Sequence, residues 1–185
     1  MNKLIYIFFF ILLYSCQSSI EKETKEFINT KVVFPSQGLC KGYYSMYTDT
    51  TVKYEYELVK FITSEACTSC KLNAIVNEEK YAKDHKINNL GMTYVISTSS
   101  DNYSNLLSLL YSERTEACVY IDTCNAFIST NPQIPNNEMF HTFVINREGK
   151  VLMVGSPFQN KKMEALFEKV IAKEHKKHKE IKKSV

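Results

Sequence analysis

The segment that most constrains the fold is FITSEACTSCKLN at residues 61–73, where an apolar stretch leads into the pair Cys67 and Cys70. The residues before the pair are rich in β-formers, and those after it carry apolar side chains at helical spacing. The pair therefore marks the junction of a strand and a helix. Because backbone N–H groups and the helix dipole favour negative charge at a helix start, a thiolate at Cys67 is expected to be stabilised.

Two thiols at such a junction suit disulfide exchange. Cys67 is predicted to attack a substrate disulfide, and Cys70, on the same side of the first helical turn, to resolve the mixed disulfide. A structural disulfide is the main alternative, although it would close a very small loop and gain little entropy. A structural zinc site would need a second close pair of ligands, and the remaining cysteines provide none, so no metal is predicted.

Besides Cys16 and the CxxC pair, the chain has three cysteines, an odd number, so they cannot all pair with one another. They are Cys40, Cys118 and Cys124. Only five residues separate the last two around an expected turn, so our weak preference is a disulfide between Cys118 and Cys124.

The N-terminus, MNKLIYIFFFILLYSC, has the layout of an export signal, with one lysine ahead of an apolar run that is too short to span a bilayer. The run ends in LYSC, which resembles the bacterial lipoprotein box. This resemblance implies removal of residues 1–15, acylation of Cys16 and a lipid anchor. Gln17 follows, which by analogy with enteric bacteria favours the outer membrane, with the protein facing the periplasm.

Of the 185 residues, about 170 would remain after this removal, which is enough for one domain with a substantial core. Residues 16–30 are polar and charged and are predicted to be a lipidated tether, residues 31–179 the domain, and residues 180–185 a charged tail. The net charge of +3 is small, and no basic-aromatic pattern indicates nucleic acid.

Strand-like and helical segments alternate along the domain. Strands are expected over 54–63, 92–97 and 117–121, helices over 69–86 and 102–114, a helical turn at 125–129, a hairpin of 139–146 with 150–154, and a final helix over 160–179 that Asn160 would cap. This order predicts an α/β fold with a mixed central sheet flanked by helices.

Three segments together resemble the thioredoxin-like superfamily, specifically the periplasmic thiol-disulfide oxidoreductases related to TlpA and ResA and the similar lipoproteins of Bacteroidetes. They are FITSEACTSCKLN, CVYIDTCNAF and FHTFVINREGKVLMVGSP. The resemblance implies a thioredoxin-like fold with the CxxC at the N-terminus of the first long helix. Cys67 would be the nucleophile and Cys70 the resolving cysteine, and no organic cofactor is expected.

The sequence departs from this family at the cis-proline that normally precedes the hairpin strand. Phe140 or His141 occupies that position. Because a cis bond before a non-proline residue costs about 2.5 to 4 kcal/mol, a trans peptide and a reshaped groove are expected. His141 could lie near the sulfurs and either lower the pKa of Cys67 or deprotonate Cys70, or it could be an ordinary histidine facing solvent or satisfied within the sheet.

The expected function is thiol-disulfide exchange with client proteins and a redox partner protein. Thr68, Ser69 and Phe140 would line the substrate groove, and Glu65 would accept a proton near Cys70. The alternative is a binding module or an SCO-like copper(I) chaperone, since two cysteines and a histidine can bind copper(I), although those chaperones use CxxxC. Whether the pair reduces or oxidises its clients depends on its potential, which the sequence does not fix.

Overall fold

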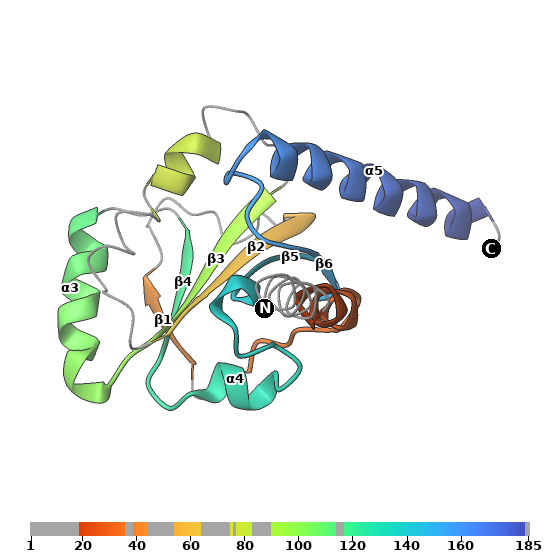
Figure 1. Ribbon diagram of the computed structural model, residues 1–185. Coiled ribbons are helices and arrows are strands. Elements are labelled where there is room, and N and C mark those ends of the chain that lie inside the picture. Colours follow the sequence, from red (N-terminus) through yellow and green to blue (C-terminus); the bar gives the residue numbers. More distant parts are fainter. Residues whose placement is uncertain are drawn as a thin grey trace, which may run out of the picture.

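The computed structural model describes residues 19–35, 39–43, 54–63, 75, 77–82, 90–113 and 117–183. A six-stranded sheet in the order β1-β4-β3-β2-β5-β6 forms its centre, with helices on both faces (Figure 1). The strands are β1 (Leu39–Tyr43), β2 (Tyr56–Ile62), β3 (Leu90–Ser97), β4 (Cys118–Asp122), β5 (Thr142–Asn146) and β6 (Val151–Val154). Residues 19–27 are helical and are called the first helix below, and residues 75 and 77–82 are also helical. The further α-helices are α3 (Tyr103–Glu113), α4 (Ala126–Thr130) and α5 (Lys161–Lys183). Two 3-10 turns are η1 (Ser100–Asn102) and η2 (Glu138–Phe140). The predicted mixed α/β sheet is confirmed.

The strand directions divide the sheet into two parts. β2, β3 and β4 are parallel to one another, whereas β5 runs antiparallel to β2, β6 antiparallel to β5, and β1 antiparallel to β4. β2 is apolar on both faces, with Val59 and Phe61 in one cluster and Leu58 and Ile62 in others. This is the pattern of a parallel strand that helices cover on both sides.

Three apolar clusters hold the helices on the sheet. The cluster on one face joins Phe61 and Phe143 to Phe27 of the first helix and to Phe127 of α4. On the other face, Leu106 and Leu110 of α3 form a second cluster with residues of β2, β3 and β4, and residues of α5 pack on β2, β5 and β6 in a third. Within the described segments, no helix combines the length and apolar character needed to cross a bilayer.

Local hydrogen bonds explain where β5 and the last helix begin. β5 begins at Thr142 rather than at residue 139, because η2 precedes it and the Asn137 side chain caps that turn by accepting from the Met139 N–H at 3.1 Å. The last helix begins after Asn160, as predicted, because Oδ1 of that residue accepts the N–H groups of the second and third helical residues. It ends at Lys183, so it takes in most of the predicted tail.

The predicted hairpin of β5 and β6 is confirmed, although four residues, 147–150, connect the two strands instead of the predicted three. Gly149 has φ +80° and donates its N–H to the carbonyl of Asn146 at 2.9 Å. A Cβ at this position would lie 2.4 Å from the carbonyl oxygen of Val32, so only glycine fits. Val32 in turn donates its N–H to the Gly149 carbonyl, which fixes the N-terminal segment against the hairpin.

The predicted tether over 16–30 needs correction, because its described part belongs to the folded domain. Residues 19–27 are helical, and Phe27 is only 1% exposed. Its ring packs edge-to-face on the rings of Phe140 and Phe143, with centroid distances of 6.3 and 5.3 Å. The charged residues around Phe27 dominate the composition, but they form only the outer face of an amphipathic helix.

Substituting Phe27→Ala should therefore lower the free energy of unfolding by about 3 to 5 kcal/mol, since a fully buried phenyl ring is lost. Urea denaturation followed by circular dichroism would measure this. Lys25→Ala, on the exposed side of the same helix, is the control and should have little effect. Equal stabilities of the two variants would show that the helix is a tether after all.

Candidate active-site edge

One edge of the sheet gathers the ends of the parallel strands. β2, β3 and β4 end there at Ile62, Ser97 and Asp122, and antiparallel β5 begins there at Thr142 (Figure 1). The carboxyl ends of parallel strands are a common location of functional sites. Cys67 follows the last residue of β2 by five positions.

The predicted site residues divide into two groups. His141 and Phe140 lie within the described part of the chain. The others lie outside the described residues and remain predictions: Cys16, Glu65, Cys67, Thr68, Ser69 and Cys70.

His141 is held at this edge through both its backbone and its ring. Its N–H donates to the carbonyl of Glu138 at 3.0 Å, and its carbonyl accepts the N–H of Phe61 at 2.8 Å. The imidazole is 8% exposed, its centroid lies 5.2 Å from that of the Phe61 ring, and Nε2 lies 3.2 Å from the carbonyl oxygen of Pro135. A histidine that faces solvent is therefore excluded, whereas one satisfied within the sheet fits these contacts. Its predicted position near the sulfurs remains a prediction.

The hydrogen bond to Pro135 also defines the chemistry available to His141. A carbonyl oxygen only accepts, so Nε2 must carry the hydrogen.

Phe140 does not fit its predicted place in a substrate groove. Its side chain is fully buried and packs edge-to-face on Phe27. It belongs to the core because η2 turns it inward, ahead of the strand. No cis peptide bond occurs in the described part of the chain, so the trans links expected at Phe140 and His141 are confirmed.

The loop that supplies the Pro135 carbonyl is fixed by Asn131, which is fully buried. The Asn131 amide nitrogen donates to the carbonyls of Val33 and Phe127, and its oxygen accepts the Val33 N–H, all at 2.8 Å. One side chain thus joins the loop to α4 and to the N-terminal segment. The acceptor for His141 is consequently positioned by core contacts.

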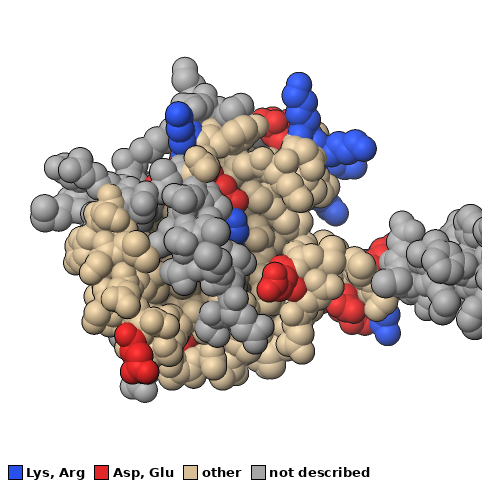
Figure 2. Space-filling view, turned by 60° about the vertical axis from the view of Figure 1, so that its left-hand side comes forward, with Lys and Arg blue, Asp and Glu red and all other residues tan. Residues whose placement is uncertain are grey.

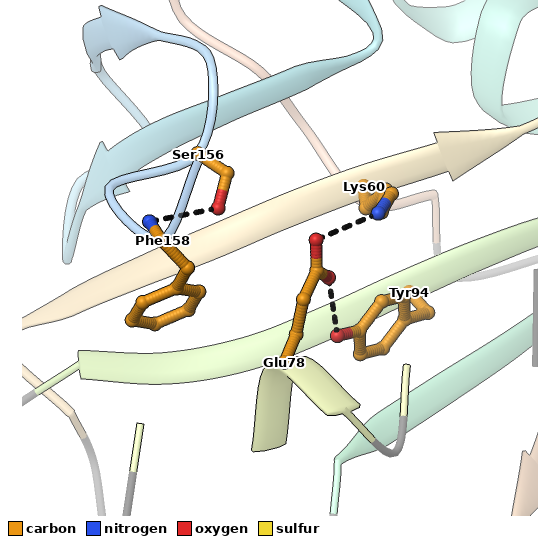
Figure 3. Close-up of polar contacts among 5 residues, drawn as sticks. All are labelled: Lys60, Glu78, Tyr94, Ser156 and Phe158. Atoms are coloured by element: carbon orange, nitrogen blue, oxygen red, sulfur yellow. Dashed lines mark hydrogen bonds and ion pairs between the residues drawn. The ribbon is translucent and has the colours of Figure 1, made fainter. Parts of the chain in front are cut away.

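A polar network connects the helix after Cys70 to the sheet (Figure 3). Lys60 Nζ on β2 lies 2.8 Å from Glu78 Oε1, and the Tyr94 hydroxyl on β3 donates to Glu78 Oε2 at 3.1 Å. The Lys60 and Glu78 side chains are only 20% and 19% exposed. Burial, and then the negative charge of Glu78, raise the pKa of the Tyr94 hydroxyl, which keeps it a donor.

Further contacts fix the same helix. Glu79 Oε1 accepts the N–H of Ala117 at 2.8 Å, just before β4 begins. Ile75 is buried in the cluster beneath α3, and the ring of Tyr81 lies 5.4 Å from that of Phe158, in the segment that leads to α5. The described part of the helix that follows Cys70 is thus bonded to two strands of the sheet and to the residue that precedes β4.

The weakly preferred disulfide between Cys118 and Cys124 is wrong. No disulfide joins these two residues. Cys118 begins β4 and Cys124 follows its end, so an extended segment of roughly 13 Å separates them, well beyond the ~7 Å limit between Cα atoms of a disulfide. Across the described residues, His, Cys, Asp and Glu side chains do not gather in threes as a metal site would require.

Sequence reasoning missed the network of Lys60, Glu78 and Tyr94. One signal was available, because Lys60 stands among apolar residues in a strand buried on both faces, and a charge in such a place needs a partner. The partner's identity was not available, since Glu78 and Tyr94 reach Lys60 only through the packing of the helix on the sheet.

Comparison with known proteins shows likeness in structure alone. No protein-family model and no curated protein matches the sequence. A domain of a possible thiol-disulfide isomerase from Cytophaga hutchinsonii matches with a TM-score of 0.52 at 13% identity, over 79% of this chain and 96% of that one. A thioredoxin-like protein in the oxidised form matches at 0.48 and 15%, over 80% and 98%. An uncharacterised thioredoxin-like protein from Porphyromonas gingivalis matches at 0.42 and 18%, over 64% and 74%.

The first of these matches, together with the strand order, shows that the fold is thioredoxin-like. The fold that the sequence resemblance implied is therefore confirmed.

The network should be measurable as a coupling between its charged members. Lys60→Met or Glu78→Gln alone leaves a mostly buried group without its counter-charge, so each should lower the free energy of unfolding by about 1 to 3 kcal/mol. The double variant should cost less than the sum of the two. A double-mutant cycle by urea denaturation would measure the difference.

The exposed pair Lys25 and Glu21, whose atoms are 2.6 Å apart, is the control for this cycle. Its coupling should be near zero because water screens both charges. Additive effects at Lys60 and Glu78 would contradict the structural role of the network.

Proposed function

We propose that this protein is a lipid-anchored, extracytoplasmic thiol-disulfide oxidoreductase that acts on protein thiols and disulfides through Cys67 and Cys70. The observation that supports the proposal is the thioredoxin-like fold, in which the end of β2 lies beside His141. In the sequence, Cys67 follows the last residue of β2 by five positions. A pair of thiols after a strand and before a helix is the arrangement in which the helix dipole favours a reactive thiolate.

The proposed reaction transfers two electrons in two exchange steps. The Cys67 thiolate attacks one sulfur of a client disulfide, so that a mixed disulfide forms and one client thiolate leaves. The Cys70 thiolate then attacks the Cys67 sulfur, releases the second client thiolate and closes the Cys67–Cys70 disulfide. Glu65 is proposed to accept the proton of Cys70, and Thr68 and Ser69 to contact the client. A redox partner protein restores the dithiol, and the reverse sequence oxidises a client dithiol.

His141 is proposed to tune this dithiol electrostatically. Its backbone bond to Phe61 places it beside the strand that leads to Cys67, and its Nε2 is committed to the Pro135 carbonyl. Protonation at Nδ1 would create a positive charge in a mostly buried position, where it stabilises a nearby thiolate more than an exposed charge would.

The location follows from the N-terminal sequence. Acylation of Cys16 would anchor the protein on the periplasmic side of the outer membrane, with the first helix beginning only a few residues later. The C. hutchinsonii domain of similar fold is described as a possible thiol-disulfide isomerase, which agrees with thiol chemistry.

The decisive test uses Cys70→Ala in the intact chain. Without the resolving thiol, mixed disulfides through Cys67 should accumulate in cells, because their intramolecular resolution is blocked. Non-reducing electrophoresis and mass spectrometry would identify the trapped clients. The matched control is Cys67→Ala, which should trap none. Equal trapping by both variants, or by neither, would refute the exchange mechanism.

A second prediction concerns His141→Gln. The Gln amide can still donate to Pro135 as Nε2 does, but it cannot titrate. We expect the pH at which Cys67 reaches half its maximal iodoacetamide reactivity to rise, while stability changes little. His141→Phe, which loses both properties, should shift the reactivity profile equally and also lower stability. An unchanged profile in both variants would leave His141 a structural residue.

A glutathione titration and a copper(I) uptake measurement distinguish the oxidoreductase function from the copper chaperone function. The exchange mechanism predicts a reversible two-electron couple in a glutathione titration. Uptake of one copper(I) that requires Cys67, Cys70 and His141, together with a dithiol that resists oxidation by glutathione disulfide, would instead support the chaperone.

A further inference from the structure

The solvent side of α5 carries a row of lysines. Residues of the opposite side pack on the sheet: Met163, Phe167, Val170 and Ile171. The row consists of Lys162, Lys169, Lys173 and Lys176, all exposed. Their spacings of seven, four and three residues place them on one face of the helix, over a length of about 21 Å. We call this row the lysine stripe.

The formal net charge of α5 is more positive than that of the whole chain. The helix holds nine lysines and four glutamates, a formal net charge of +5, whereas the whole protein carries +3. The remainder of the chain is therefore slightly acidic. Figure 2 shows both acidic and basic side chains on one face of the described molecule.

The end of α5 projects beyond the sheet (Figure 1). Near that end, His175 Nε2 lies 3.0 Å from Glu55 Oε1, and its ring lies 5.9 Å from that of Tyr56. Eight helical residues follow, to Lys183. Lysines such as Lys169 and Lys173, four residues apart, repel each other and destabilise a solvated helix. A negatively charged surface along the stripe would remove this repulsion.

We propose that the lysine stripe docks α5 on anionic lipid headgroups. Its lysines lie in a line along one side of a helix, so all of them can contact a flat surface at the same time. Its cations are all lysines. A lysine ammonium is a point charge that can bind phosphates in many positions, whereas the arginine guanidinium favours two-pronged binding of one carboxylate or phosphate. The inference rests on the proposed lipid anchor only for proximity to a bilayer. Acyl chains together with a polybasic surface are a combination that gives stable membrane attachment.

Vesicle binding tests the proposal in the mature chain, from residue 16 onward, carrying Cys16→Ser, which lacks both the apolar export signal and the acylated thiol. The protein should co-sediment with vesicles of phosphatidylcholine mixed with phosphatidylglycerol, but not with phosphatidylcholine alone, and binding should fall as salt rises. Each stripe lysine should contribute about fivefold to partitioning, so the triple variant Lys169→Gln, Lys173→Gln, Lys176→Gln should bind about a hundredfold more weakly.

The control removes the same charge from another surface through Lys22→Gln, Lys25→Gln and Lys31→Gln, three exposed lysines of the N-terminal segment. This variant should lose far less affinity than the stripe variant. Equal losses, equal binding to both kinds of vesicle, or no binding to anionic vesicles would overturn the proposal. Failure of the glutathione titration would refute the oxidoreductase function but leave this result standing.

Discussion

The structure depends on β2 being buried on both faces. Val59 and Phe61 face the cluster of the first helix and α4, and Leu58 and Ile62 face the clusters that hold α3 and α5. A strand in this position pairs with a neighbour on each side, parallel to β3 and antiparallel to β5. That arrangement brings the end of β2 and the start of β5 to one edge, which is why Phe61 lies beside His141.

Lys60 is the exception to the apolar character of β2, and its charge organises the nearby helix. A lysine in this position would be costly without a counter-charge, so the side chain requires Glu78. Glu78 also accepts the Tyr94 hydroxyl, which fixes the helix against two strands at once. A thiol pair at the start of that helix would be held by directional contacts as well as by apolar packing, and such rigidity helps two sulfurs stay within bonding reach.

Local patterns in the sequence predicted most of the fold, and tertiary contacts determined what they missed. Runs of β-forming and apolar residues identified each described strand except β1, because such runs are typical of buried strands. The role of Phe27 was missed because a single apolar residue among charges does not reveal what it packs against. The proposed Cys118–Cys124 bridge failed for a reason already visible in the sequence, since the predicted strand beginning near Cys118 keeps the two residues apart.

No proline directly precedes the hairpin strand, and contacts of Phe140 and His141 join this position to the N-terminal segment. His141 is held through the Pro135 carbonyl, whose loop Asn131 joins to Val33. Beside it, Phe140 packs on Phe27 of the first helix. The peptide before the hairpin is thus positioned by residues that follow the predicted lipid attachment site. Because Phe27 and Phe140 are both buried, a displacement of the N-terminal helix would disturb the core next to His141.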